Sequence, residues 1–195
     1  MSSRSVVVLV AAFSGFATQA GAQSTSRQGI EVSGSVASHR LWDDESSIGT
    51  GVAGGGAISV PLTATLRLRG RVIGFGNERD FGNGVVFEAT GVRYTADLLW
   101  QPSSSKYAPY FGGGIGGLSY TRRSQYPLGP GQPGQPVGAR STFTRSGTDS
   151  IFGGLAGFNA VATDRFRLHP EFSLWFSRPG YFIVIEVGVL ASYRF

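Results

Sequence analysis

Apolar and polar residues alternate one by one along several stretches of this chain. In residues 62–74, apolar side chains alternate with Arg67, Arg69 and Arg71. Residues 181–195 repeat the pattern, with apolar or aromatic residues at every odd position. A period of two places neighbouring side chains on opposite faces of a β-strand, whereas three alternating arginines cannot share one face of a helix. The pattern therefore predicts strands that have one apolar face and one charged face.

The same alternation, weaker where glycine and serine are frequent, predicts eight strands and almost no helix beyond the N-terminal segment. The expected strands cover residues 30–39, 50–60, 62–74, 91–100, 107–120, 151–161, 166–176 and 181–195. The connections after the first, third and fifth strands are long and cover residues 40–49, 75–84 and 121–147. The connections after the even-numbered strands are short. This order of lengths is typical of an up-and-down barrel with both chain ends on one side.

Composition is consistent with a single domain and excludes several classes of protein. The chain has 195 residues, of which 41% are hydrophobic, only 15% are charged and 30 are glycine. Cysteine is absent, which excludes a disulfide framework and thiolate chemistry. The net charge is +5, but no basic run is longer than Arg122-Arg123, and no nucleic-acid-binding motif accompanies it. A nucleic-acid partner is therefore not expected, and nothing implies a metal or an organic cofactor.

The first 22 residues have the layout of a secretory signal peptide. Arg4 precedes a short apolar run at residues 6–13, and the small residues Ala20-Gly21-Ala22 precede Gln23. The apolar run is too short for a membrane-spanning helix, which needs about 20 residues. We therefore expect residues 1–22 to be a cleaved signal peptide and residues 23–195 to form the folded domain.

The distribution of charge predicts which face of the strands lines the inside of the barrel and which face contacts the surrounding medium. Arginines and carboxylates share one face, whereas the other face is continuously apolar. The inside of a barrel can pair charges with one another, but a face in contact with lipid cannot. Aromatic residues at strand ends, such as Trp100 and Tyr181, are candidates for the two aromatic girdles of a membrane barrel. The alternative for such a secreted all-β chain is a soluble antiparallel sandwich.

Together, these features resemble the small outer-membrane β-barrel family of Gram-negative bacteria, the OmpA/OmpX-like group. The resemblance rests on the signal peptide, the eight strands, the segment at residues 109–116 and the terminal residues 190–195. It implies an eight-stranded antiparallel up-and-down transmembrane β-barrel in the outer membrane, with the termini on the periplasmic side. It also implies contact with outer-membrane lipid and lipopolysaccharide. Tyr193 and Phe195 resemble the signal that the outer-membrane assembly machinery reads.

Such a barrel would turn a cluster of charges inward. The strand at residues 62–74 would face the strand at residues 166–176 across the lumen, and buried arginines need acids beside them. We expect a central cluster that closes the lumen, composed of Arg67, Arg69, Arg71, Asp97, Glu171 and Glu186. The expected role is structural or surface-interacting, and for surface interaction the partner would be an extracellular ligand.

Two alternative functions remain open at this stage. One is a small pore, although an eight-stranded barrel leaves an interior that side chains can fill. The other is a hydrolase that modifies lipid A, because His169, Glu171 and Ser173 share one strand face. Lipid A deacylases have Ser two residues after His followed by Asn; here Glu171 takes the Ser position and the Asn is missing. Arg178-Pro179-Gly180 only faintly resembles the Asn-Pro-Gly segment of that family. An enzyme is therefore not expected.

Overall fold

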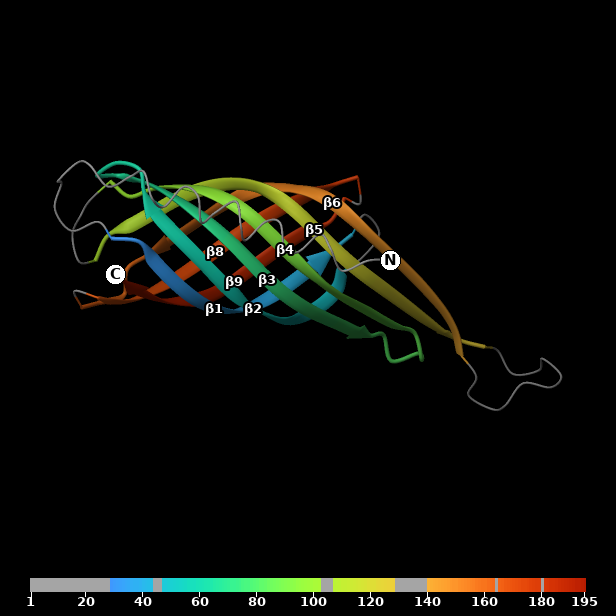
Figure 1. Cartoon of the computed structure of the whole chain (residues 1–195). Helices are drawn as coiled ribbons and strands as arrows, with labels where there is room; N and C mark the ends of the chain where they lie inside the picture. Colours follow the sequence, from blue (N-terminus) through green and yellow to red (C-terminus); the bar gives the residue numbers. More distant parts are fainter. Residues whose placement is uncertain (1–28, 44–46, 103–106, 129–139, 164, 180) are drawn as a thin grey trace.

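The computed structural model describes residues 29–43, 47–102, 107–128, 140–163, 165–179 and 181–195, which form one antiparallel sheet (Figure 1). Within these ranges the strands are β1 (Glu31–Trp42), β2 (Ser47–Pro61), β3 (Leu66–Asp80), β4 (Val86–Trp100), β5 (Pro109–Pro127), β6 (Arg140–Phe158), β7 (Val161–Ala162), β8 (Phe166–Arg178) and β9 (Ile183–Arg194). Among the described residues, no helix is long and apolar enough to cross a membrane. The predicted signal peptide lies outside the described residues.

The sheet closes on itself into a barrel. Each long strand pairs with the next long strand along the chain, β6 pairs with β8, and β9 returns to pair with β1. The two-residue strand β7 pairs only with β8. Glu31 lies opposite Arg194 in the closing pair, so the two ends of the described chain meet at one end of the barrel. The predicted eight-stranded up-and-down barrel is confirmed, with β7 as a small addition.

The barrel has the reverse of the polarity of a soluble protein. Its outer surface carries large exposed apolar side chains, whereas its inside holds buried charges. The outward residues are Val32, Val36, Val52, Ile58, Val72, Val92, Leu98, Ile115, Phe152, Phe172, Val187 and Val189. The buried charged residues are Glu31, Arg67, Arg69, Arg71, Arg93, Asp97, Asp149, Glu171 and Glu186. Each strand alternates between these two environments, as the period of two predicts.

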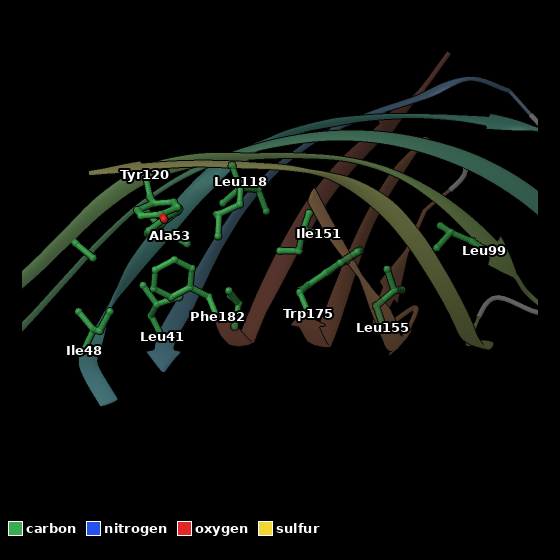
Figure 2. Packing of buried hydrophobic residues seen from close by; sticks show 14 of the residues in the cluster. Leu41, Ile48, Ala53, Leu99, Leu118, Tyr120, Ile151, Leu155, Trp175 and Phe182 are labelled. Atoms are coloured by element: carbon green, nitrogen blue, oxygen red, sulfur yellow. The ribbon is translucent and has the colours of Figure 1, made fainter. Parts of the chain in front are cut away.

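The interior is layered along the barrel axis. On β3 the inward residues nearest the chain ends are Arg67, Arg69 and Arg71, and the next two are Ile73 and Phe75. The apolar layer is continued by other buried residues from all round the barrel, among them Leu41, Ile48, Leu118, Ile151, Trp175 and Phe182 (Figure 2). The lumen therefore holds most of its buried charges toward the chain ends and much of its hydrophobic cluster toward the opposite end, where Asp149 is also buried.

Two of the predicted loops are largely strand. β3 runs to Asp80, so the connection predicted at residues 75–84 shrinks to a turn at residues 81–85. The prediction of a loop at residues 121–147 is also wrong, because β5 continues to Pro127 and β6 begins at Arg140. These extensions carry polar residues on their outer face and therefore lack the apolar period of the barrel strands. Cross-strand pairing between them holds the extended conformation.

The extensions of β3, β4, β5 and β6 form a sheet that rises above one side of the barrel. β8 pairs with β6 only from Ser150 to Gly157, so β6 continues upward without it. In Figure 1 the β5–β6 hairpin projects farthest from the end that holds the C-terminus. We call this projecting sheet, comprising the described residues 78–90, 119–128 and 140–149, the wall.

Glycine permits two strands to approach closely inside the barrel. A Cβ atom added at Gly116 of β5 would lie 1.9 Å from the Tyr94 carbonyl oxygen and 2.8 Å from Thr95 Cα. Both of these are backbone atoms of β4, which cannot move aside as a side chain could. By contrast, a Cβ atom at Gly74, on the outer face of β3, would meet nothing closer than 3.9 Å.

Gly116→Ala is therefore expected to lower the free energy of unfolding by about 1–3 kcal/mol, the usual cost of overpacking. Gly74→Ala should change it little, because the added methyl group points outward into open space. Urea unfolding of the refolded barrel, followed by tryptophan fluorescence, measures both. Equal effects of the two substitutions would contradict the close approach of β4 and β5.

Candidate functional site

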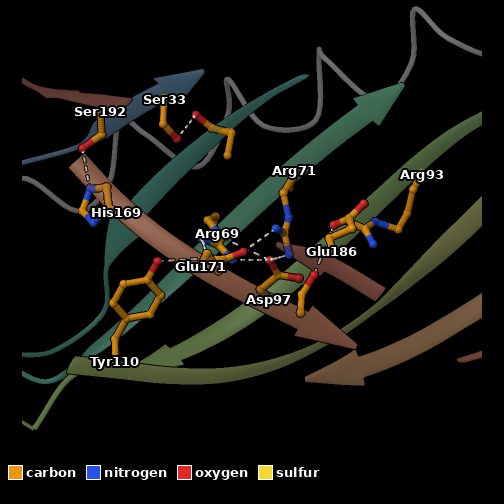
Figure 3. Close-up of polar contacts among 12 residues, drawn as sticks. Ser33, Arg69, Arg71, Arg93, Asp97, Tyr110, His169, Glu171, Glu186 and Ser192 are labelled. Carbon is orange, nitrogen blue, oxygen red and sulfur yellow. Dashed lines mark hydrogen bonds and ion pairs between the residues drawn. The ribbon is translucent and has the colours of Figure 1, made fainter. Parts of the chain in front are cut away.

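The centre of the lumen holds a closed ring of two arginines and two acids (Figure 3). Arg69 Nη1 donates to Glu171 Oε2 at 2.7 Å, and its Nε donates to Asp97 Oδ2 at 3.1 Å. Arg71 Nη1 donates to Glu171 Oε1 at 2.6 Å, and its Nη2 donates to Asp97 Oδ2 at 3.1 Å. Each acid thus bridges both arginines, so the four charges balance one another without solvent.

The ring joins opposite sides of the barrel. Arg69 and Asp97 are direct register partners on β3 and β4, whereas Glu171 comes from β8, four strands away around the ring of strands. Tyr110 of β5 donates its hydroxyl group to Glu171 Oε2 at 3.0 Å. The side chains therefore span the lumen and cross-link β3, β4, β5 and β8.

Small residues on β5 leave the space that the ring occupies. A Cβ atom at Gly114 would lie 2.4 Å from Asp97 Oδ1 and 2.6 Å from the Ala96 carbonyl oxygen. A side chain at this position would displace the Asp97 carboxylate from the arginines. Gly114 is thus part of the charged site.

Contrary to the prediction, Glu186 does not join this ring. Its partner is Arg93 of β4, at 2.5 Å between Arg93 Nη2 and Glu186 Oε2, and the Ser173 hydroxyl group also donates to it at 3.1 Å. The prediction assumed a β8–β9 hairpin that would set Glu186 beside Glu171. In the observed register Glu186 lies opposite Ser173, and Glu171 lies opposite Gly188. This shift moves Glu186 one layer farther from the chain ends, beside Arg93.

Arg67 also lies outside the central ring. Residues two apart on a strand are about 6.8 Å apart along it. Arg67 therefore points inward one layer closer to the chain ends than Arg69. There its Nη2 atom lies 3.1 Å from Glu31 Oε2, in a group that also contains Arg167 and Arg194. Of the six predicted residues, the structure brings four into direct contact: Arg69, Arg71, Asp97 and Glu171.

Arg93, Glu31 and Tyr110 also take part in the buried charge network, although the alternating pattern did not lead to their prediction. Arg93 was recognisable, because it alternates with Thr95 and Asp97 on the charged face of β4. Its guanidinium group lies over the ring of Trp175, at 4.9 Å from the ring centroid, and Arg71 approaches the same ring at 5.5 Å. Glu31 gave no signal, because it begins a strand rich in serine and glycine, where the alternation is weak.

The three residues of the hydrolase alternative do not contact one another as a catalytic group would. His169 Nε2 lies 2.7 Å from the Ser192 hydroxyl oxygen. Glu171 binds Arg69, Arg71 and Tyr110, and Ser173 donates to Glu186. All three point into the lumen, away from the outer apolar surface where a lipid would approach.

The cavities found in the described part of the lumen are of water size. One has a volume of about 30 Å³ and lies near the chain ends, between Glu31, Arg67, Asn159 and His169. Another, of about 20 Å³, lies beside Arg71, Glu171 and Glu186. Each has room for one or two water molecules.

The wall at the opposite end carries a second candidate site on its inner face. Phe81, Phe87, Tyr126 and Phe143 form a row of edge-to-face ring contacts across the wall, with centroids 5.1, 6.1 and 5.9 Å apart in turn. Phe143 is 63% exposed although it continues the inward-facing register of β6. The wall therefore presents a row of aromatic rings above the barrel opening.

Arginines accompany this row of rings. Arg79 lies over the Phe81 ring at 4.4 Å, and Arg122 lies over the Phe87 ring at 5.1 Å. Arg122 of β5 is the direct register partner of Arg145 of β6, so two like charges face each other across the strands. Arg122 is paired with Asp43, whereas Arg145 is exposed. Two like charges opposite each other are unfavourable, and the Asp43 carboxylate offsets the charge of Arg122.

The outer face of the wall differs from the outer face of the barrel. On β5 the exposed apolar residue Ile115 is followed by Ser119 and Thr121, whose hydroxyl groups bond to Thr148 and Ser146 of β6 at 3.1 and 2.9 Å. Farther along β5, Arg123 pairs loosely with Glu88 at 3.7 Å. The apolar outer surface therefore ends between residues 115 and 119 of β5.

The two residues predicted to be an assembly signal lie at the end of β9. Tyr193 points outward and is 41% exposed, and Phe195 is 77% exposed. Their rings meet edge to face with centroids 5.1 Å apart. They therefore form an exposed aromatic pair at the end of the barrel where the chain ends meet.

Glu171→Gln is expected to lower the free energy of unfolding by about 3–5 kcal/mol, because it leaves the buried charges of Arg69 and Arg71 short of an acid. Glu88→Gln is the matched control. It removes an exposed pair with Arg123, which should be worth less than about 1 kcal/mol. Urea unfolding of the two refolded variants measures the difference. If both variants unfold at the wild-type urea concentration, the central ring does not stabilise the barrel.

A comparison with models of protein families gives no match, and neither does a comparison with curated proteins. Solved structures do match. Ail, the attachment invasion locus protein of Yersinia pestis, is 15% identical and aligns with a TM-score of 0.59 over 86% of this chain and 99% of its own. Ail has also been solved in complex with the heparin analogue sucrose octasulfate, with a TM-score of 0.57. Neisserial surface protein A (NspA) is 16% identical, with a TM-score of 0.57 over 86% of this chain and 97% of its own. The chain therefore has the fold of the small eight-stranded outer-membrane β-barrels.

Proposed function

We propose that this protein spans the outer membrane of a Gram-negative bacterium as a closed barrel and uses its wall to bind an anionic ligand at the cell surface. The single observation that carries the surface role is the inner face of the wall, where exposed aromatic rings and arginines lie side by side above the barrel. Its fold supports the membrane location, and the interior supports a scaffold rather than a channel.

The reversed polarity is the main support for the membrane location. A band of exposed Val, Leu, Ile and Phe side chains around a barrel would be unstable in water but suits contact with lipid. The band ends on β5 where Ser119 and Thr121 replace Ile115 on the outer face. We place the membrane boundary at this change, so that the wall stands outside the lipid.

The orientation follows from the position of the wall. In outer-membrane barrels the short turns are periplasmic and the long connections are extracellular. The wall and the two ends of the described chain, at residues 29 and 195, lie at opposite ends of the barrel (Figure 1). We therefore place the chain ends in the periplasm, with residues 1–22 as the cleaved signal peptide. Tyr193 and Phe195 then lie at the periplasmic end, where the assembly machinery and the lipid headgroups would contact them.

A closed interior is favoured over a pore. The cavities near the charged layers are of water size, and the ring formed by Arg69, Arg71, Asp97 and Glu171 crosses the lumen between them. The hydrophobic cluster around Ile73 and Phe75 adds a second barrier, because an ion would lose its hydration shell there. A lipid-modifying hydrolase is disfavoured, because His169 and Ser173 have separate partners and face the lumen.

An anionic saccharide is the class of ligand that fits the wall best. Aromatic faces accept sugar rings, and guanidinium groups bind sulfate, phosphate or carboxylate groups in a bidentate manner. Because Asp43 already pairs with Arg122, an incoming anion would bind chiefly to the exposed Arg145 beside it. Ail, which shares the fold, has been solved with a sulfated saccharide. For this protein, the expectation of a saccharide ligand rests on the aromatic rings and arginines of its own wall.

Ile115→Arg is expected to cost about 2–4 kcal/mol of stability in a lipid bilayer, since it would place a charge in the middle of the apolar band. Thr121→Arg, on the same outer face of β5 but above the proposed boundary, should be nearly neutral. Urea unfolding of each variant refolded into phospholipid vesicles measures both. Two equal losses, or two neutral results, would contradict the proposed membrane boundary.

Arg145→Gln is expected to weaken binding of heparin, used as the probe for anionic saccharides, by about 10-fold or more, since a hydrogen bond to a charged group contributes about 1.5–3 kcal/mol. Arg123→Gln is the control, because it removes one equal charge from the outer face of β5. Titration of the purified protein in detergent measures both affinities. Equal losses would mean that heparin senses only net charge, and no binding by the wild type would reject the saccharide ligand while leaving the membrane location intact.

A further inference from the structure

The periplasmic end of the lumen holds more positive than negative charge. Three guanidinium groups surround the single carboxylate of Glu31. Arg194 Nη2 lies 2.6 Å from Glu31 Oε1, Arg67 Nη2 lies 3.1 Å from Glu31 Oε2, and Arg167 Nη1 lies 3.7 Å from Glu31 Oε1. Among the described residues, this group therefore carries three positive charges and one negative charge.

These charges are poorly exposed to solvent. The side chains of Arg67, Arg167 and Arg194 are only 11%, 16% and 14% exposed, and that of Glu31 is 8% exposed. Removing like charges from water together is unfavourable unless counter-charges accompany them. The next layer supplies no further acid, because its two carboxylates, Asp97 and Glu171, already bind Arg69 and Arg71. Of the three arginines around Glu31, Arg167 has the longest contact with its carboxylate, at 3.7 Å.

A cavity of about 30 Å³ opens between these residues. Its lining includes the amide of Asn159 and the hydroxyl groups of Ser33, Ser59 and Ser192, together with the Glu31 carboxylate and the apolar side chains of Leu99 and Leu190. Asn159 is only 1% exposed, and its Nδ2 atom has no hydrogen-bond partner in the structure. The Nε atom of Arg167 is likewise buried without an acceptor. A buried donor without an acceptor lowers the stability of the fold. An acceptor in this cavity would remove that cost for both groups.

We propose that this cavity binds a small carboxylate group that enters from the periplasmic end. The carboxylate would accept from Arg167 and from the Asn159 amide, and it would place a second negative charge beside Arg167. The size is suitable, because the cavity has room for about two water molecules, which is similar to the two oxygens of a carboxylate. This site is separate from the wall and goes beyond the proposed surface function.

Acetate is the probe for this site, with chloride at equal concentration and pH as the control for ionic strength. A ligand that binds only the folded state raises the stability as its concentration exceeds its dissociation constant. We expect sodium acetate to raise the urea midpoint of the purified full chain in detergent above the midpoint in sodium chloride. Equal midpoints in the two salts would overturn the proposal.

Asn159→Asp tests the site from within the protein. It replaces the unpartnered amide by a built-in carboxylate, so the midpoint in chloride should rise above that of the wild type, and the additional effect of acetate should disappear. Asn83→Asp adds the same charge in the exposed turn after β3, at the other end of the barrel, and should retain the wild-type response to acetate. An unchanged acetate effect in Asn159→Asp would overturn the proposal.

If Asn159→Asp does not refold, Arg167→Gln provides the second variant. It removes the arginine with the longest contact to Glu31 and leaves the close Arg194 and Arg67 pairs in place. The acetate effect should then fall to less than half of the wild-type value. A full acetate effect in this variant would place the anion elsewhere and reject the assigned cavity.

Discussion

The pairing of buried guanidinium groups with carboxylates is the constraint on which the rest of this barrel depends. An eight-stranded barrel has a narrow interior, and lipid on its outside would leave the lumen as the place for charged side chains. Arg69 and Arg71 can be buried there only because Asp97 and Glu171 each bridge them. The same pairing requires a glycine at position 114 of β5, since a side chain there would occupy the place of the Asp97 carboxylate.

This pairing also explains how the protein can be stable without a conventional core. In a soluble domain the apolar residues gather inside, but here many of the large apolar side chains face outward. Ion pairs and hydrogen bonds through the lumen connect opposite strands in place of part of that apolar packing. The hydrophobic cluster around Phe75 and Trp175 fills the remaining space, so the interior combines two kinds of packing in successive layers.

The two ends of the barrel are specialised in different ways. At the wall the polarity rule is reversed again, with hydroxyl and charged groups on the outer face and aromatic rings on the inner face. Such a surface is suited to water on one side and a ligand on the other. At the opposite end three arginines lie around Glu31, beside the cavity for which we propose a carboxylate ligand. The cross-linked ring of charges lies between the two ends.

The sequence by itself determined the fold class and the faces of the strands. The alternation of residues with a period of two is a local property, and it identified Arg69, Arg71, Asp97 and Glu171 as inward residues because a strand directs them there whatever its neighbours are. The tertiary structure decided which charges meet. The pairing of Glu186 with Arg93, and of Arg67 with Glu31, depends on strand register and on position along the barrel axis. A shift of two residues in the register of β8 and β9 moves the Glu186 carboxylate by a whole layer. The wall was likewise not predicted from the sequence. Its strands lack the alternation of apolar and polar residues, and pairing with their neighbours holds them extended.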